Sequence, residues 1–175
     1  MDVCSYTYRV LTAADGASWA ALRREGARDF PLGFLITAEE ADAMTPEKAQ
    51  PILDQGMMRG VFDGSSLVGF CGFRRETLAR TKHRAEIGPF FVTTAYQGRG
   101  AARTLMAGVI NEAQVRGIEQ LELFVDVGNH RALTFYERQG FKRISIHPDG
   151  VRIDGQVRDA YFCIIRPGEI LSAYN

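Results

Sequence analysis

The spacing of apolar residues divides the chain into strand-like and helix-like segments. Short apolar runs rich in aromatic and β-branched residues predict strands at 6–11, 57–62, 67–73, 85–93, 120–127, 141–146 and 157–165. Apolar residues at every third or fourth position predict helices after Asp15, after Thr37 and from about residue 101 to Gly117, and a short helix at 129–139. We expect Pro46 to interrupt or restart the second helix. This order predicts an α/β (α+β) fold, a mixed sheet covered by helices.

Two pairs of neighbouring strands are expected to form hairpins. Asp63-Gly64-Ser65-Ser66 separates the first pair and is a good hairpin signal, because Asp-Gly favours tight turns. The last two strands are separated by two candidate turns, Pro148-Asp149-Gly150 and Asp154-Gly155. Their residues alone leave open which of the two closes the hairpin.

A glycine turn, Gln97-Gly98-Arg99-Gly100-Ala101-Ala102, connects a predicted buried strand with the long helix. Gly98 and Gly100 allow the backbone to adopt positive φ or to approach a ligand closely. The helix that follows directs its first N–H groups and the positive end of its dipole toward this turn. The segment therefore predicts an anion site, most naturally for a pyrophosphate. A plain tight turn before a helix is the alternative that this segment alone leaves open.

Two other phosphate-binding turns fit the segment poorly. A P-loop ends in Gly-Lys-Ser/Thr, whereas Gly100 is followed by two alanines. A dinucleotide-binding turn needs a third glycine at the position that Arg103 occupies. A nucleotide-binding regulator is therefore disfavoured.

Composition limits the classes of partner and compartment. The 175 residues suit one domain, 1–175, and the 21 basic and 21 acidic residues give no net charge that favours nucleic acid or an anionic membrane. Cys4, Cys71 and Cys163 are widely spaced and odd in number, which argues against a disulfide framework or a zinc site and favours reduced core thiols. With no signal peptide or membrane-length apolar segment, a soluble cytoplasmic protein is expected.

Two motifs in the chain resemble those of the GNAT N-acetyltransferase superfamily. Gln97, Gly100 and Ala102 match its coenzyme A loop, Gln/Arg-x-x-Gly-x-Gly/Ala. The segment from Asn129 to Phe141 matches its pattern Asn-x-x-Ala-x-x-x-Tyr-x-x-x-Gly-Phe. The order and spacing of the two motifs, and the order of the predicted elements, also match, so the resemblance covers nearly the whole chain.

The resemblance implies an acetyl-CoA-dependent N-acetyltransferase, in which an amine attacks the thioester directly through a tetrahedral intermediate and no metal takes part. Asn129 is then expected to orient the coenzyme arm, and Tyr136 to protonate the leaving sulfur. The alternative roles are a helix cap for Asn129 and core packing for Tyr136. The residues that the resemblance assigns to the coenzyme are Phe90, Phe91 and Val92 on the strand, Gln97, Gly98, Arg99, Gly100, Ala101 and Ala102 in the loop, Arg103, and Asn129.

Glu86 is the candidate catalytic base, because some members of the family carry a carboxylate at this place on the central strand. A surface ion pair with Arg84 or Lys82 is the alternative. Glu25 is a second carboxylate in reach of an amine, although its neighbours Arg23 and Arg24 favour a solvated face. The three histidines show no metal spacing, and Cys71 is expected to be an inert buried thiol.

The acceptor stays open between a small-molecule amine and a protein N-terminus or lysine. Its choice is expected to depend on residues 15–55 and on the final hairpin around 147–157. The sequence does not specify an oligomeric state, and a homodimer stays open. The alternative function is a non-catalytic acyl-CoA-binding sensor or interaction module, against which the presence of Tyr136 argues, since a sensor needs no proton donor.

Overall fold

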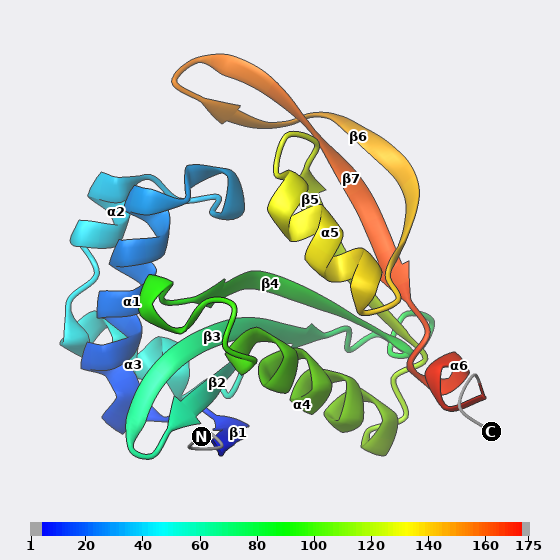
Figure 1. Cartoon of the computed structure of the whole chain (residues 1–175), viewed down its shortest axis with the longest axis horizontal. Coiled ribbons are helices and arrows are strands. Elements are labelled where there is room, and N and C mark those ends of the chain that lie inside the picture. The colour runs from blue at the N-terminus through cyan, green and yellow to red at the C-terminus, as the bar shows by residue number, and fades with distance from the viewer. Residues whose placement is uncertain (1–4, 173–175) are drawn as a thin grey trace. The chain divides into compact units, whose positions relative to one another are not determined.

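The computed structural model describes the backbone of residues 5–172 (Figure 1). The seven strands follow the order β1-β2-β3-β4-β5-β7-β6 in the sheet. Strands β4 and β5 are parallel, whereas the pairs β1–β2, β2–β3, β5–β7 and β6–β7 are antiparallel. The expected mixed sheet with helices is therefore confirmed. The strands are β1 (Tyr6–Val10), β2 (Met58–Asp63), β3 (Ser66–Arg75), β4 (Arg84–Val92), β5 (Gln120–Asp126), β6 (Lys142–Ile153) and β7 (Gln156–Ile165).

The helices are close to the positions that the spacing predicts. They are α1 (Gly16–Asp29), α2 (Ala38–Asp42), α3 (Pro46–Leu53), α4 (Ala101–Val115), α5 (His130–Arg138) and α6 (Pro167–Ser172). Pro46 begins a new helix rather than interrupting the previous one, and Thr37 and Glu40 form the capping box of α2, with Glu40 N–H donating to Thr37 Oγ1 at 3.1 Å. The sequence analysis did not predict α6. None of the helices in the described part of the chain is long and apolar enough to cross a membrane.

The chain divides into two compact units, and β3, β4 and α4 run through both. The first unit holds residues 5–73 and 89–109, with β1, β2, β3 and helices α1 to α3, which are grouped in blue to cyan in Figure 1. Its core is apolar and contains five large rings, which belong to Trp19, Phe34, Phe62, Phe70 and Phe91. Three of these form one cluster, since Phe34, Phe70 and Phe91 lie within 6.4 Å of one another, centroid to centroid.

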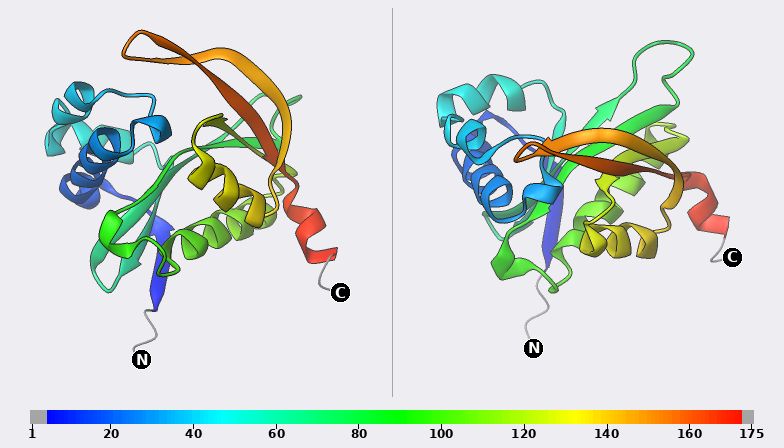
Figure 2. Two further views of the ribbon diagram at one scale, coloured as in Figure 1. Left: turned by 45° about the horizontal axis from the view of Figure 1, so that its top comes forward. Right: turned by 90° about the horizontal axis from the view of Figure 1, so that it is seen from above.

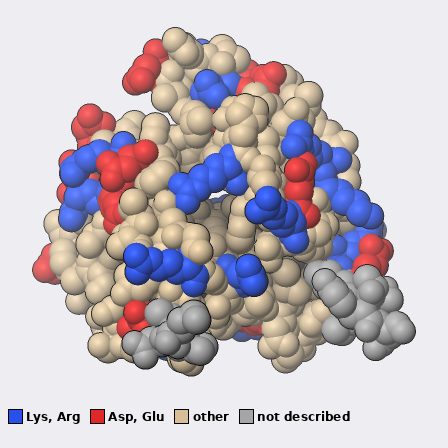
Figure 3. All heavy atoms as spheres, in the orientation of Figure 1, with Lys and Arg blue, Asp and Glu red and all other residues tan. Residues whose placement is uncertain are grey.

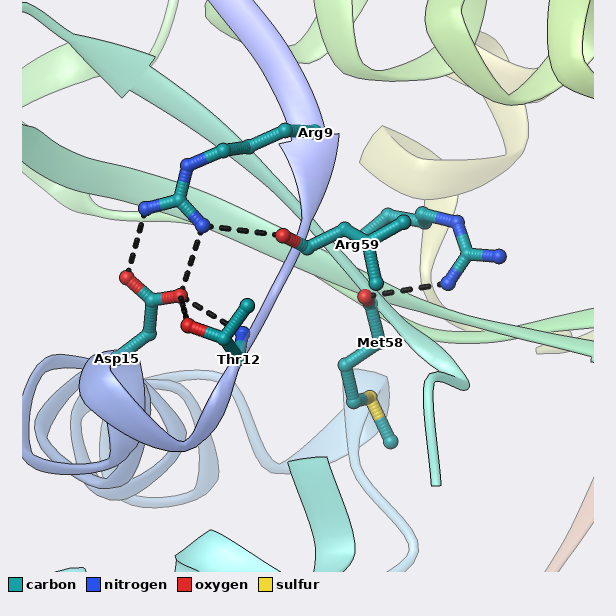
Figure 4. Close-up of polar contacts among 6 residues, drawn as sticks. Arg9, Thr12, Asp15, Met58 and Arg59 are labelled. Carbon is teal, nitrogen blue, oxygen red and sulfur yellow. Dashed lines mark hydrogen bonds and ion pairs between the residues drawn. The ribbon is translucent and has the colours of Figure 1, made fainter. Parts of the chain in front are cut away.

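Asp15 precedes the first residue of α1 and connects this helix with β1. It occupies the N-cap position without a side-chain cap hydrogen bond. Its carboxylate instead accepts two hydrogen bonds of 2.8 Å from the guanidinium of Arg9 and one of 2.8 Å from the backbone N–H of Thr12 (Figure 4). These donors lower the pKa of Asp15, the hydrogen bond from Arg9 most of all. Asp15 therefore joins α1 to the end of β1.

The second unit holds residues 74–88 and 110–172, including β5, β6, β7 and α5. Its long, twisted β6–β7 hairpin is orange in both views of Figure 2. The turn Asp154-Gly155 closes this hairpin, because Ile153 pairs with Gln156 and both turn residues have positive φ, 51° and 77°. The other candidate turn, residues 148–150, lies inside β6, where the register shifts between His147 and Val151.

The cysteines and the surface agree with the composition. Cys71 and Cys163 are buried thiols, while Cys4 lies outside the described residues. Burial raises the pKa of the Cys163 thiol. On the face drawn in Figure 3, basic and acidic side chains both occur, as zero net charge implies.

Candidate active site

The glycine turn lies at the N-terminus of α4 in the first unit. A short 3-10 turn, Thr94–Tyr96, follows β4 and leads into residues 97–100. Gly98 has φ +75° and Gly100 has φ +95°, a region that glycine adopts without strain. A Cβ added at Gly98 would meet no atom within 4 Å, so the turn leaves open space beside its backbone. The expectation of positive φ at both glycines is confirmed.

The first N–H groups of α4 are available to a ligand. The backbone N–H of Thr104 donates to Gly100 O at 3.0 Å, which is the first helical hydrogen bond. Within residues 5–172, no backbone carbonyl accepts a hydrogen bond from the N–H groups of Ala101, Ala102 or Arg103. Such donors, with the positive end of a 15-residue helix dipole, suit an anion.

Two N–H groups of the glycine turn already donate to carbonyls of the preceding turn, Thr94–Tyr96. Gln97 N–H donates to Thr94 O at 3.3 Å, and Arg99 N–H donates to Tyr96 O at 3.4 Å. Not all the backbone N–H groups of residues 97–102 are therefore available to bind an anion. The available donors are the N–H groups of Gly98 and Gly100 and those at the start of α4.

The side chain of Gln97 braces the turn. Its Nε2 donates to the backbone carbonyl of Val92 at 2.8 Å, which connects the turn to the end of β4. Tyr96 adds a second brace, because its hydroxyl donates to Asp63 Oδ2 at 3.0 Å in the β2–β3 turn. These two contacts hold the backbone on which the anion donors lie.

Arg99 and Arg103 place positive charge beside these donors. Both side chains belong to exposed residues. In the described part of the chain, neither guanidinium has a carboxylate partner. Guanidinium groups bind phosphate oxygens in bidentate fashion, so both arginines are suited to phosphates.

The pairing of β4 with β5 ends early. In the second unit, the parallel register covers only Arg84–Gln120, Ala85–Leu121 and Glu86–Glu122, whereas β5 continues to Asp126. Gly88 follows with φ +151°, and Pro89, which has no N–H, comes next. The register of β4 with β5 therefore ends just before Gly88 and Pro89.

The residues of β4 beyond this break belong to the first unit. Phe91 and Val92 are 5% exposed, and the Phe91 ring packs in the core cluster. The side chains of Phe91 and Val92 therefore pack in the core, so it is the backbone of these residues that is available to contact a ligand.

Glu86 forms an ion pair in the second unit. Its carboxylate accepts a hydrogen bond from Arg74, and both side chains are about half exposed. The alternative of an ion pair is therefore present, but with Arg74 and not with Arg84 or Lys82; Arg84 instead pairs with Glu122 at 2.9 Å. Strands β3 and β4 are neighbours in the sheet, and their pairing brings Arg74 close to Glu86. The residues next to Glu86 in the sequence do not indicate this contact.

Asn129 caps α5 in the second unit. Its Oδ1 accepts a hydrogen bond from the N–H of Ala132 at 3.2 Å, which confirms the expected cap geometry. Within the described residues, its Nδ2 amide has no hydrogen-bond partner in the protein. Asn129 is therefore able to cap the helix through one atom and to donate to a ligand through the other.

Asp126 and Arg158, which the sequence analysis missed, hold Asn129 in place. Asp126 Oδ1 accepts from Gly128 N–H at 2.7 Å, and the Asp126 carbonyl accepts from Asn129 N–H at 2.9 Å. Arg158 in β7 donates to both carboxylate oxygens, at 2.5 and 2.7 Å, and this lowers the pKa of Asp126. The only sequence signal was an aspartate at the end of a strand, directly before Val-Gly-Asn.

Tyr136 lies two turns along α5 from Asn129, or about 10 Å along the axis. Its ring packs edge-on against Phe141 and Phe135, with centroids 5.6 and 5.5 Å away. The backbone carbonyl of Tyr136 also accepts from Phe141 N–H at 3.0 Å. These contacts hold a half-buried phenol in one orientation on the helix.

Glu25 is not on a solvated face with Arg23 and Arg24. Its carboxylate accepts hydrogen bonds from Thr93 and Thr94, at the end of β4, in the first unit. Arg24 pairs with Asp42 at 3.2 Å instead, and the guanidinium of Arg23 lies 5.3 Å from the ring centroid of Trp19.

Comparisons with known proteins agree with this fold. The chain is 30% identical over 128 residues to a mycothiol acetyltransferase from Brachybacterium faecium, covering 73% of this chain and 38% of that protein. It is 36% identical over 103 residues to the N-alpha-acetyltransferase RimI from Mycobacterium tuberculosis, covering 58% of this chain and 61% of that protein. The chain thus spans less than two thirds of either relative.

A solved structure and a family model extend the comparison. A Salmonella typhimurium protein solved with its cofactor acetyl-CoA has the same fold, with a TM-score of 0.79 and 15% identity over 93% of this chain and 94% of that one. The model of the Acetyltransferase (GNAT) family matches residues 19–141, which include the glycine turn and the motif that starts at Asn129. The chain therefore belongs to the Acetyltransferase (GNAT) family.

Proposed function

We propose that the protein is an N-acetyltransferase that moves the acetyl group of acetyl-CoA to a primary amine. The observation that carries the proposal is the turn between β4 and α4. Two glycines with positive φ, open space beside the backbone and uncommitted N–H groups at a helix start suit a pyrophosphate. Family membership makes coenzyme A the pyrophosphate-containing ligand that best fits this turn.

In this proposal, each group of residues binds one part of the coenzyme. The N–H groups of Gly98, Gly100, Ala101 and Ala102 hold the pyrophosphate, and Arg99 and Arg103 pair with phosphate oxygens. The backbone of 90–92 binds the pantetheine arm, which fits the loss of β4–β5 pairing after Glu86. The sequence motif assigns Asn129 to orienting the coenzyme arm. Its Nδ2, which has no partner among the described residues, is the donor that this role requires.

The reaction needs few protein groups. The thioester is already activated, so the amine nitrogen attacks the acetyl carbonyl carbon, the C–N bond forms and the C–S bond breaks. The amine loses a proton, and the coenzyme sulfur gains one. We assign the second proton to the Tyr136 phenol, which is protonated at neutral pH because its ordinary pKa is about 10.

Glu86 is the proposed acceptor of the amine proton, directly or through water. Its ion pair with Arg74 places a cation beside the carboxylate, so an incoming ammonium competes with Arg74. An amine that arrives neutral reduces the need for a strong base. The proposal therefore predicts a smaller effect for Glu86→Gln than for Tyr136→Phe.

The acceptor is a primary amine of a small molecule or of a protein, at an N-terminus or a lysine. The names of the two relatives cover both kinds, since one is a mycothiol acetyltransferase and the other an N-alpha-acetyltransferase. We infer that the side chains of residues 15–55 and of the final hairpin around 147–157 select between them.

The experiment is an assay of free thiol released from acetyl-CoA by the purified protein. The panel contains small primary amines, peptides with a free N-terminus and the same peptides with a blocked N-terminus. Thiol release that depends on a free amine, with a matching mass increase of the acceptor, supports the proposal. A protein that binds acetyl-CoA but acetylates no amine in the panel supports the non-catalytic acyl-CoA sensor instead.

A further inference from the structure

Helix α1 and the end of β4 are joined by a single carboxylate. Glu25 Oε1 accepts from the backbone N–H of Thr94 at 2.9 Å and from its hydroxyl at 3.1 Å. The Thr93 hydroxyl lies 2.9 and 2.8 Å from the two carboxylate oxygens of Glu25. All three residues belong to the first unit, although 68 positions separate Glu25 from Thr93.

The contact supplies a cap that the turn itself lacks. Thr93 is the N-cap of the turn Thr94–Tyr96, and its own side chain makes no cap hydrogen bond. Glu25 takes that role from another element, because it accepts from the first N–H of the turn. Hydrogen bonds to an ionised carboxylate are stronger than those between neutral groups.

The packing of α1 fixes the position of Glu25. Gly26, the next residue, lies against the rings of Phe34 and Phe91, where a Cβ would overlap Phe34. The missing side chain allows α1 to approach the Phe91 segment of β4 closely. Glu25 is thereby held beside Thr93, two residues beyond Phe91.

The turn that Glu25 caps leads directly into the anion donors. Tyr96 N–H donates to Thr93 O at 2.9 Å, and Arg99 N–H donates to Tyr96 O, so the backbone is hydrogen-bonded stepwise from Thr93 to Arg99. Gly98 and Gly100 lie at the end of this series. A change at Thr93 therefore alters the direction of the N–H groups that we assign to the pyrophosphate.

We propose that Glu25 is a positioning residue for coenzyme binding. It touches neither coenzyme nor acceptor, and it acts by capping the turn that sets the pyrophosphate donors. The inference rests on the proposed function, since it concerns the same coenzyme site. Within the described residues, its carboxylate has threonine partners alone, which distinguishes it from Asp15, Glu86 and Asp126, each paired with an arginine.

The test compares acetyl-CoA affinity by titration calorimetry in the parent, Glu25→Ala, Glu25→Gln and Asp29→Ala. Asp29 is the matched control, an exposed acid on the same helix. We expect Glu25→Ala to raise the dissociation constant about tenfold, the size of one hydrogen bond to a charged group. Glu25→Gln keeps one oxygen acceptor and should lie in between, while Asp29→Ala should bind like the parent.

Two further readouts separate positioning from general stability. Thr93→Val removes the hydroxyl, and the double variant with Glu25→Ala should bind no more weakly than Glu25→Ala alone, because both remove one contact. In the acetyl-transfer assay, Glu25→Ala should raise the KM for acetyl-CoA while kcat changes less than about twofold.

Each failure has its own signature. A folded Glu25→Ala variant that binds acetyl-CoA as tightly as the parent, or fully additive effects of Glu25→Ala and Thr93→Val, contradicts the role of Glu25 alone. A parent that binds no acetyl-CoA contradicts the proposed function itself.

Discussion

The side-chain amide of Gln97 donates to the backbone carbonyl of Val92 at 2.8 Å, so the first residue of the glycine turn is tied to the last residue of β4. This contact gives the glutamine of the coenzyme loop a structural role. It holds the spacing between the strand and the pyrophosphate donors.

Gln97→Ala should therefore weaken coenzyme binding without abolishing it. The Val92 carbonyl loses its partner, and we expect the dissociation constant for acetyl-CoA to rise about fivefold, as for one hydrogen bond of roughly 1 kcal/mol. Titration calorimetry measures this. Gln50→Ala, an exposed glutamine on α3, is the control and should bind like the parent. Equal affinities in Gln97→Ala and the parent would show that the brace is dispensable.

Tyr136→Phe should slow turnover and leave the fold intact. Phenylalanine keeps the ring contacts with Phe141 and removes only the hydroxyl, so we expect kcat to fall about a hundredfold, the size of a lost general acid. Affinity for acetyl-CoA should stay within about twofold. Tyr161→Phe in β7 is the matched control. Unchanged kcat in Tyr136→Phe would remove the phenol from the reaction.

The ion pair of Asp126 and Arg158 should make stability depend on acid pH. Hydrogen bonds from Arg158 lower the pKa of Asp126 below its unfolded value of about 3.9, so its contribution is present above about pH 4 and is lost as pH falls through the folded pKa. Asp126→Asn should lower the free energy of unfolding at pH 7 by about 1.5 kcal/mol, the size of one hydrogen bond between charged groups at a partly exposed site. Urea unfolding of both proteins should show this difference shrinking below pH 4; a difference that stays constant down to pH 3 would refute the assignment.

Gly26→Ala should destabilise the first unit, although alanine favours helices. The added Cβ overlaps the Phe34 ring, and such overpacking costs about 2 kcal/mol, more than the roughly 1 kcal/mol that alanine contributes. Gly168→Ala is the control, since its Cβ would meet no atom within 4 Å. Thermal unfolding should place the first variant below the parent and the second at or above it. A Gly26→Ala protein as stable as the parent would show that Phe34 moves aside at little cost.

Local signals predicted most of the fold. Neighbouring residues in the sequence indicate several local features that the structure contains. These are the capping box at Thr37, the Asp-Gly turn after β2 and the positive φ of the glycines at 98 and 100. Local signals did not determine which turn closes the final hairpin. Both candidate turns have suitable residues, and the pairing of Ile153 with Gln156 across the chain decides between them.

Long-range partners were not predictable from the sequence alone. Arg74 with Glu86, Arg158 with Asp126 and Glu25 with Thr93 meet only because strands and helices pack together. The ion pair considered as the alternative for Glu86 took its nearest basic neighbours in the sequence as partners. Those partners were wrong for this reason. Single residues of the proposed active site were suggested by family motifs, and their roles stay predictions that the experiments above test.

The most direct test of the account is whether acetyl-CoA binds at the glycine turn. Thermal unfolding with and without acetyl-CoA should be measured for the parent, Gly100→Glu and Gly64→Glu, a control glycine in the β2–β3 turn that also has positive φ. At about 100 times the dissociation constant, binding contributes roughly 2.7 kcal/mol, a shift of several degrees. We predict that shift for the parent and Gly64→Glu and none for Gly100→Glu. No shift in the parent, or an equal shift in a folded Gly100→Glu, would contradict the account.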